Sequence, residues 1–121
     1  MALKHLAHKP PAPLPVAPGW GIVATDGESP GVLRLECHDR TESLPYHTLT
    51  RWTLKPGDED VLTLHAGGLV VAVRGRELAP VRDALDAGRL VSLQATEGRY
   101  LALKLGTVVT SIILSSENSH D

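Results

Sequence analysis

The sequence predicts a mainly β protein of the α+β class: a small, strongly bent antiparallel sheet or barrel of about seven to eight short strands, with one short helix near residues 77–87. Short apolar or alternating runs recur along the chain, turn residues separate them at frequent intervals, and only one stretch has helical spacing. Apolar residues make up 42% of the 121-residue chain, which is enough for the core of one domain. Because Phe is absent, Leu, Val, Ile and Ala must supply most of that core.

Both ends of the chain are predicted to lie outside this domain. Residues 1–19 form an arm with prolines at these positions: Pro10, Pro11, Pro13, Pro15 and Pro18. Such a run favours extended polyproline II and cannot join a central strand, so we interpret it as a flexible surface arm. The PxxP motif within it is by itself a weak signal for a proline-recognition domain. Residues 115–121 are small and polar and are predicted to be a frayed tail, which leaves 20–114 as a single β-rich domain.

The first half of the domain is predicted to contain three extended segments, at residues 21–25, 32–38 and 43–54. In the second of these, apolar and polar residues alternate, which is typical of a strand with one face in water. A polar turn at residues 39–42 separates it from the third, in which Pro45 indicates an edge strand or a bend.

The clearest secondary-structure signals lie between Val61 and Ala95 and begin with a hairpin. The Gly67-Gly68 pair stands between two apolar runs, and both glycines tolerate the positive φ that two-residue turns require. We therefore expect residues 61–66 and 69–73 to pair as antiparallel strands, the second of them shielded from water on both faces.

The single helix is predicted directly after this hairpin. Four apolar residues recur there at helical spacing: Leu78, Val81, Ala84 and Leu85. Pro80 is tolerated only in a first helical turn, so the helix must begin between Glu77 and Pro80, and Gly88 is a natural stop. A helix this short is marginal alone and must be stabilised by packing its apolar face on the sheet.

The remaining strands are predicted at residues 90–95, 100–105 and 107–114, with a turn at Glu97-Gly98. The apolar faces of all these elements define an expected core. Its members are Leu33, Leu35, Leu62, Leu64, Val71, Val73, Leu85, Leu93, Leu101 and Leu103.

Composition disfavours several function classes. The net charge of −2 argues against a general polyanion binder, and two Trp with two Tyr make a poor platform for stacking bases. A single cysteine, Cys37, cannot form an internal disulfide and suits a reducing compartment. No apolar run approaches the length of a membrane span and no secretory signal is evident, so we expect a cytoplasmic protein without membrane contact.

Candidate chemistry is sparse, and no residue can be given a catalytic role. Cys37-His38-Asp39 combines the parts of a thiol nucleophile, but adjacent strand residues point to opposite faces, so Cys37 is predicted to be a buried structural thiol. His38, His47 and His65 form a weak candidate zinc site, because no pair among them has tight ligand spacing. No cofactor signature is present: the chain lacks GxGxxG, GxxxxGK[ST], GxSxG, HExxH and CxxC.

Arginines offer a second candidate site. Arg74 and Arg76 precede the predicted helix, and Arg82, Arg89 and Arg99 follow in or after it. They could contact an anion or a nucleic acid, although pairing with neighbouring carboxylates such as Glu77 or Asp83 is the simpler interpretation.

Three hypotheses on function remain open. We favour a non-enzymatic β-rich module that binds another protein or itself, because the predicted sheet has edges and the chain is apolar-rich and nearly neutral. The alternative is a small nucleic-acid-binding barrel that uses the arginines. The third and least supported is a small hydrolase or metal enzyme built around the three histidines.

A homodimer is the expected form of self-association. The segment Thr107–Leu114 contains neither proline nor charge, and its Val108, Val109, Ile112 and Ile113 are β-branched. Natural edge strands usually carry a charge or a proline that prevents strand addition. This segment is therefore predicted to pair either inside the fold or across a two-fold axis.

Overall fold

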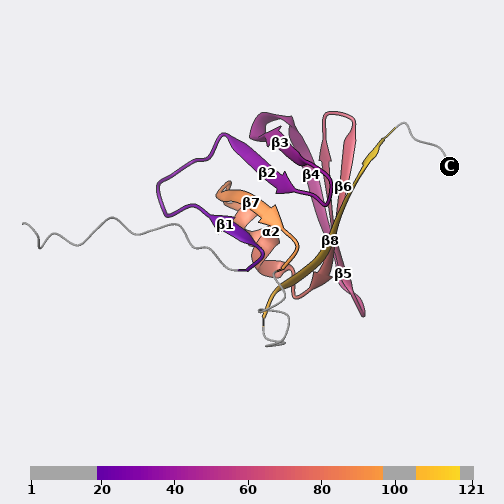
Figure 1. Ribbon diagram of the computed structural model, residues 1–121. Coiled ribbons are helices and arrows are strands. Elements are labelled where there is room, and N and C mark those ends of the chain that lie inside the picture. Colours follow the sequence, from indigo (N-terminus) through magenta and orange to yellow (C-terminus); the bar gives the residue numbers. More distant parts are fainter. Residues whose placement is uncertain (1–18, 97–105, 118–121) are drawn as a thin grey trace, which may run out of the picture.

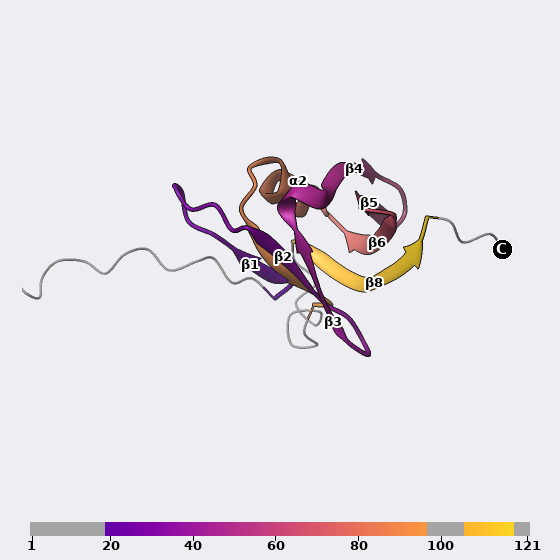
Figure 2. The ribbon, with the colours of Figure 1, turned by 90° about the horizontal axis from the view of Figure 1, so that it is seen from above.

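The structure, a computed structural model, describes residues 19–96 and 106–117. Eight strands of this part form two four-stranded sheets (Figure 1). In spatial order, the first sheet contains β1 (Gly21–Val23), β7 (Leu90–Gln94), β2 (Val32–Glu36) and β3 (Thr41–Pro45). The second contains β4 (Leu49–Lys55), β5 (Asp60–Ala66), β6 (Leu69–Arg76) and β8 (Val108–Ser116). The helix α2 (Ala79–Asp86) connects β6 to β7, and Figure 2 shows it at one end of the two sheets.

The mainly β class is confirmed, but the sheets do not close into a barrel. The predicted antiparallel pairing holds for every described strand pair except β2 and β7, which pair in parallel. The cause lies in the connection through α2, which carries the chain from the second sheet back to the first. There β7 inserts between β1 and β2, and the chain then returns to place β8 beside β6.

The hairpin predicted around two glycines is confirmed. Ala66 of β5 lies opposite Leu69 of β6, and Gly67 and Gly68 have φ of 54° and 85° between them. These positive values are what a two-residue turn requires to match the twist of its strands. The hairpin continues into β4 on one side, so that β4, β5 and β6 form a meander.

The helix forms where its spacing predicted. Pro80 lies in its first turn, and Val81, Ala84 and Leu85 are buried on the sheets. Its N-terminus lacks a side-chain cap from the preceding residue; instead Oδ2 of Asp60, at the start of β5, accepts a hydrogen bond of 3.2 Å from the backbone N–H of Leu78. The helix is thereby tied to the second sheet at Leu78, the residue that precedes its first turn.

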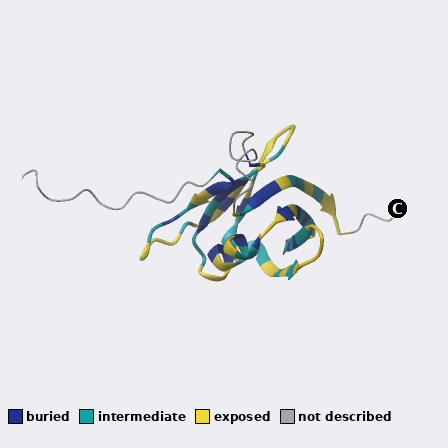
Figure 3. Ribbon diagram, turned by 90° about the horizontal axis from the view of Figure 1, so that it is seen from below, coloured by how far each residue is buried: buried dark blue, intermediate teal, exposed yellow. Residues whose placement is uncertain are grey.

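One hydrophobic core lies between the inner faces of the two sheets and α2, and Figure 3 shows the buried residues concentrated there. Every expected core residue in the described part is buried: Leu33, Leu35, Leu62, Leu64, Val71, Val73, Leu85 and Leu93. Leu101 and Leu103, like the predicted strand at residues 100–105 and the turn at Glu97-Gly98, lie outside the described residues.

Several element boundaries differ from the predicted ones. The turn after β2 lies two residues earlier than predicted, at residues 37–40: β2 ends at Glu36, the N–H of Cys37 donates to the carbonyl of Arg40 (2.8 Å), and β3 begins at Thr41. The extended segment 43–54 is divided by a 3₁₀ turn at Tyr46–Thr48, directly after Pro45, so that its halves join different sheets. The last strand, β8, continues to Ser116, where register with Leu69 extends the ladder.

Candidate functional site

The candidate arginines are distributed over several elements rather than placed along one strand or helix. Arg74 and Arg76 lie on β6, Arg82 on α2 and Arg89 just before β7, whereas Arg99 lies outside the described residues. Three of them have acidic neighbours: Glu59 lies 3.6 Å from Arg74, Asp83 lies 3.0 Å from Arg82, and Asp26 pairs with Arg89. These carboxylates offset the positive charge that would attract a polyanion.

The candidate histidines also lie on separate elements. His38 follows β2, His47 lies in the 3₁₀ turn, and His65 lies on β5. Nδ1 of His65 contacts Oε2 of Glu117 at 3.0 Å, which joins β5 to the residue after β8. Within residues 19–96 and 106–117, no group of three or more His, Cys, Asp or Glu side chains could hold a metal ion.

Cys37 is half-buried rather than fully buried, because it lies at the end of β2 beside a cleft. Its thiol faces the carbonyl of Leu35 with an Sγ–O distance of 3.9 Å. Desolvation by burial raises its pKa above the ordinary value, and the nearby Arg40 guanidinium offsets this only in part. A raised pKa keeps the thiol protonated at neutral pH, which argues against a nucleophile built on Cys37-His38-Asp39.

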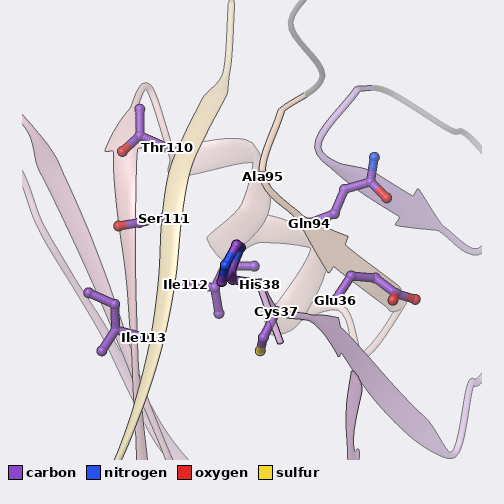
Figure 4. Close-up of a pocket in the computed structure, with 9 residues that line it drawn as sticks. All are labelled: Glu36, Cys37, His38, Gln94, Ala95, Thr110, Ser111, Ile112 and Ile113. Atoms are coloured by element: carbon purple, nitrogen blue, oxygen red, sulfur yellow. The ribbon is translucent and has the colours of Figure 1, made fainter. Parts of the chain in front are cut away.

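The cleft beside Cys37 separates β8 from the ends of β2 and β7 and has a volume of about 530 Å³ (Figure 4). Its lining comes from both sheets: Glu36, Cys37, His38, Gln94, Ala95, Thr110, Ser111, Ile112 and Ile113. A smaller depression of about 230 Å³ shares Cys37, His38, Ile112 and Ile113 with it and reaches Arg40 and Leu114. The two form one continuous groove along β8, which we call the β8 groove.

Two hydrogen bonds between Thr96 and Val109 define the near end of the β8 groove. The N–H of Thr96 donates to the carbonyl of Val109 (2.8 Å), and the N–H of Val109 donates to Oγ1 of Thr96 (2.7 Å). The chain after β7 thus covers the first residues of β8. Beyond Val109, no strand of the described part pairs with β8 on the side away from β6.

The groups that β8 presents to the groove follow from its register. At the far end, Glu117 N–H donates to the carbonyl of Gly68 (2.8 Å), in line with the ladder between β8 and β6. Successive residues of an antiparallel strand direct their N–H and C=O groups to alternate sides. Ile113 therefore bonds to β6, whereas Ile112 and Leu114 direct their backbone donors and acceptors into the groove.

The chemistry of β8 suits strand addition. No residue from Val108 to Ser116 carries a charge, and the strand is nine residues long. The side chain of Ile113 is 53% exposed, the highest value among the exposed large hydrophobic residues of the described part. Ile112 and Leu114 pack against the core, so their side chains fix the strand while their backbone groups face outward.

The sequence pointed to β8 but not to the groove. Absence of charge and proline in residues 107–114 was the available signal. The groove is also lined by the turn after β2 and the end of β7. These segments are separate from β8 in the sequence, and no local sequence pattern predicts that they lie beside it.

No known protein family, curated protein or solved structure matches this chain. In the part of the chain that the structure describes, no helix is long and apolar enough to cross a membrane.

Proposed function

We propose that this protein is a non-enzymatic binding module that pairs with an extended protein strand along the open edge of β8, and that a second copy of the chain is its first partner. The observation that carries the proposal is the edge itself: β8 is long and uncharged, and no other described strand pairs with its residues 110–114 on the side away from β6. An added strand gains main-chain hydrogen bonds at Ile112 and Leu114.

A second copy is the favoured partner because β8 is compatible with itself. Two antiparallel β8 strands related by a two-fold axis would join their four-stranded sheets into one continuous sheet. Like charges opposite each other destabilise such a pair, and β8 has none from Val108 to Ser116. The single Cys37 suits a reducing compartment, and we place this activity in the cytoplasm.

Sedimentation velocity over a concentration series tests the proposal. The unmodified chain should form a dimer as concentration rises, and Ile113→Lys should remain monomeric, because a lysine on an edge strand opposes strand addition. Ile113 is the position to change, since Ile112 packs against the core and its substitution would also affect folding. The matched control is Val32→Lys, at a residue of β2 that is 41% exposed.

The control should dimerise like the unmodified chain. Equal loss of dimer in both variants, or a monomer at every concentration of every variant, would contradict self-association through β8.

Nucleic-acid binding through the arginines is the alternative, and no contact among the described residues favours it. We expect no binding of RNA or DNA at physiological salt. Sub-micromolar binding that weakens steeply with salt would reverse this ranking.

A further inference from the structure

The Pro-rich arm has a pattern that bears on the β8 edge. Within it Pro11, Pro13 and Pro15 occupy every second position, with Ala12 and Leu14 between them. In an extended chain, every second residue directs its backbone groups to the same side. Proline has no N–H, so one side of such a segment lacks donors while the other keeps them. This segment is suited to pair on one side only.

The arm joins the described chain beside the β8 groove. The carbonyl of Gly19 accepts a hydrogen bond of 3.2 Å from Nε2 of Gln94, and the N–H of Gln94 donates to the carbonyl of Trp20 (2.9 Å). Gln94 itself lines the groove, at the end where Thr110 lies (Figure 4). The arm therefore begins at one end of the surface that it would cover.

Length and direction fit as well. From Thr110 to Leu114 the strand spans roughly 13 Å at the usual rise of a β-strand. Residues 12–16 of an extended, proline-rich chain span nearly the same distance, roughly 12 Å. Traced from Gly19 toward the far end of the groove, the arm runs from residue 18 down to residue 10, so its direction is antiparallel to β8.

We propose that residues 11–16 of the arm dock in the β8 groove of their own chain as an added edge strand, antiparallel to β8. Ala12, Leu14 and Val16 face β8 and supply N–H donors, and the prolines between them face outward. That outer side has no donors, so the sheet ends there. The proposal rests on the proposed function, because the arm competes for the same edge and thereby regulates pairing with a second copy.

Physical considerations favour docking within one chain over exchange between chains. A short tether gives the arm an effective concentration in the millimolar range, above the concentration of most proteins. Residues that precede proline, such as Ala12 and Leu14, are already restricted to extended conformations, which lowers the entropy cost of docking. The fixed φ of proline departs from that of an ideal strand, so the arm pairs over few residues and a partner strand can displace it.

Paramagnetic broadening in the full-length chain tests the contact. A nitroxide is attached at Lys9→Cys in a Cys37→Ser background, just outside the docking segment. Amide signals of Ile112 to Leu114 and of His38 should broaden. Those of Gly57 and Asp58 should not, because the turn between β4 and β5 lies at the opposite end of the sheet, where Thr110 contacts Glu59. Leu14→Pro removes the central donor and should abolish the broadening. Leu14→Ala removes the same side chain, keeps the donor and should retain most of it.

Isotope mixing separates the two kinds of docking. Nitrogen-15 chain without nitroxide is mixed with unlabelled chain that carries it, and no broadening should appear. Broadening in this mixture that equals that of the singly labelled sample would show docking on another copy and overturn the proposal. Broadening that is absent from the full-length chain, or unchanged by Leu14→Pro, would also overturn it.

Sedimentation then distinguishes this proposal from the proposed function. If both hold, Leu14→Pro should tighten the dimer about five- to tenfold, as expected for loss of a competing backbone contact. Arm contact without a dimer in any variant supports docking and refutes self-association. A dimer that Ile113→Lys abolishes, with no arm contact in the unmodified chain, supports self-association and refutes docking.

Discussion

The indole Nε1 of Trp52 on β4 donates a hydrogen bond of 2.8 Å to Oδ1 of Asp86 in the last turn of α2. The contact joins the edge strand of the second sheet to the helix that leads away from it. Asp60 ties the other end of the helix to β5. The helix is therefore fastened to one sheet at both ends, while its apolar face packs on the core between the sheets.

Removing the carboxylate that accepts the Trp52 hydrogen bond should destabilise the folded protein. Asp86→Ala should lower the free energy of unfolding by about 0.5–1 kcal/mol, the lower part of the usual range because the pair is partly exposed. Urea denaturation monitored by tryptophan fluorescence measures it. Asp83→Ala is the matched control on the same helix, since the side chain of Asp83 pairs with the exposed Arg82; it should change stability by less. Equal effects would mean that charge, not the indole bond, matters.

The packing of the helix should contribute more than its polar contacts. Leu85 is 1% exposed and lies in the core, so Leu85→Ala should cost about 2–5 kcal/mol through lost burial and the cavity left behind. Thermal and urea unfolding both report it. Ile113→Ala, at an exposed site, should stay within about 0.5 kcal/mol of the unmodified chain. A small effect of Leu85→Ala would show that the helix does not anchor on this residue.

Cys37 should react with thiol reagents in the folded protein, but slowly. It is half-buried in the β8 groove, and desolvation raises its pKa, so little thiolate is present at pH 7. The rate should rise as pH increases toward that raised pKa. Kinetics with a disulfide reagent, with and without denaturant, measure this. Labelling at neutral pH as fast as in the unfolded chain would contradict both the burial and the raised pKa.

Tyr46 should make the fold sensitive to alkali. Its hydroxyl donates a hydrogen bond of 2.6 Å to the carbonyl of Leu90, and burial raises its pKa from 10.0 to about 12. Because the folded state holds this proton more tightly than the unfolded state, the contribution is complete below pH 10 and is lost as pH rises toward 12. Tyr46→Phe should be less stable at pH 7 and should lose less stability across that interval. Unfolding curves of both proteins at several pH values test this.

Local signals predicted the local parts of the fold. The Gly67-Gly68 hairpin and the helix around Val81 follow from turn chemistry and from apolar spacing, which depend on neighbours in the sequence. Alternation in residues 32–38 correctly placed Leu33 and Leu35 inside. This alternation could not predict which strands pair with β2, because it defines the two faces of a strand and not its neighbours in the sheet.

Local patterns do not identify neighbouring strands, and this explains the remaining differences between the predicted and the observed fold. The parallel pairing of β2 with β7 depends on where the connection through α2 delivers the chain. Division of residues 43–54 between two sheets depends on a bend after Pro45 that the sequence allowed but did not require. The β8 groove depends on both, so the residues that could serve binding were visible only in part.

The return of the chain from β7 to β8 has a consequence for the order of folding. β4, β5 and β6 are consecutive and can assemble from local contacts, which form quickly. One edge of β6 stays unpaired until β8 is synthesised, after α2 and β7. During translation this flank of β6 is thus an exposed strand edge, which favours aggregation of the growing chain until residues 108–116 emerge.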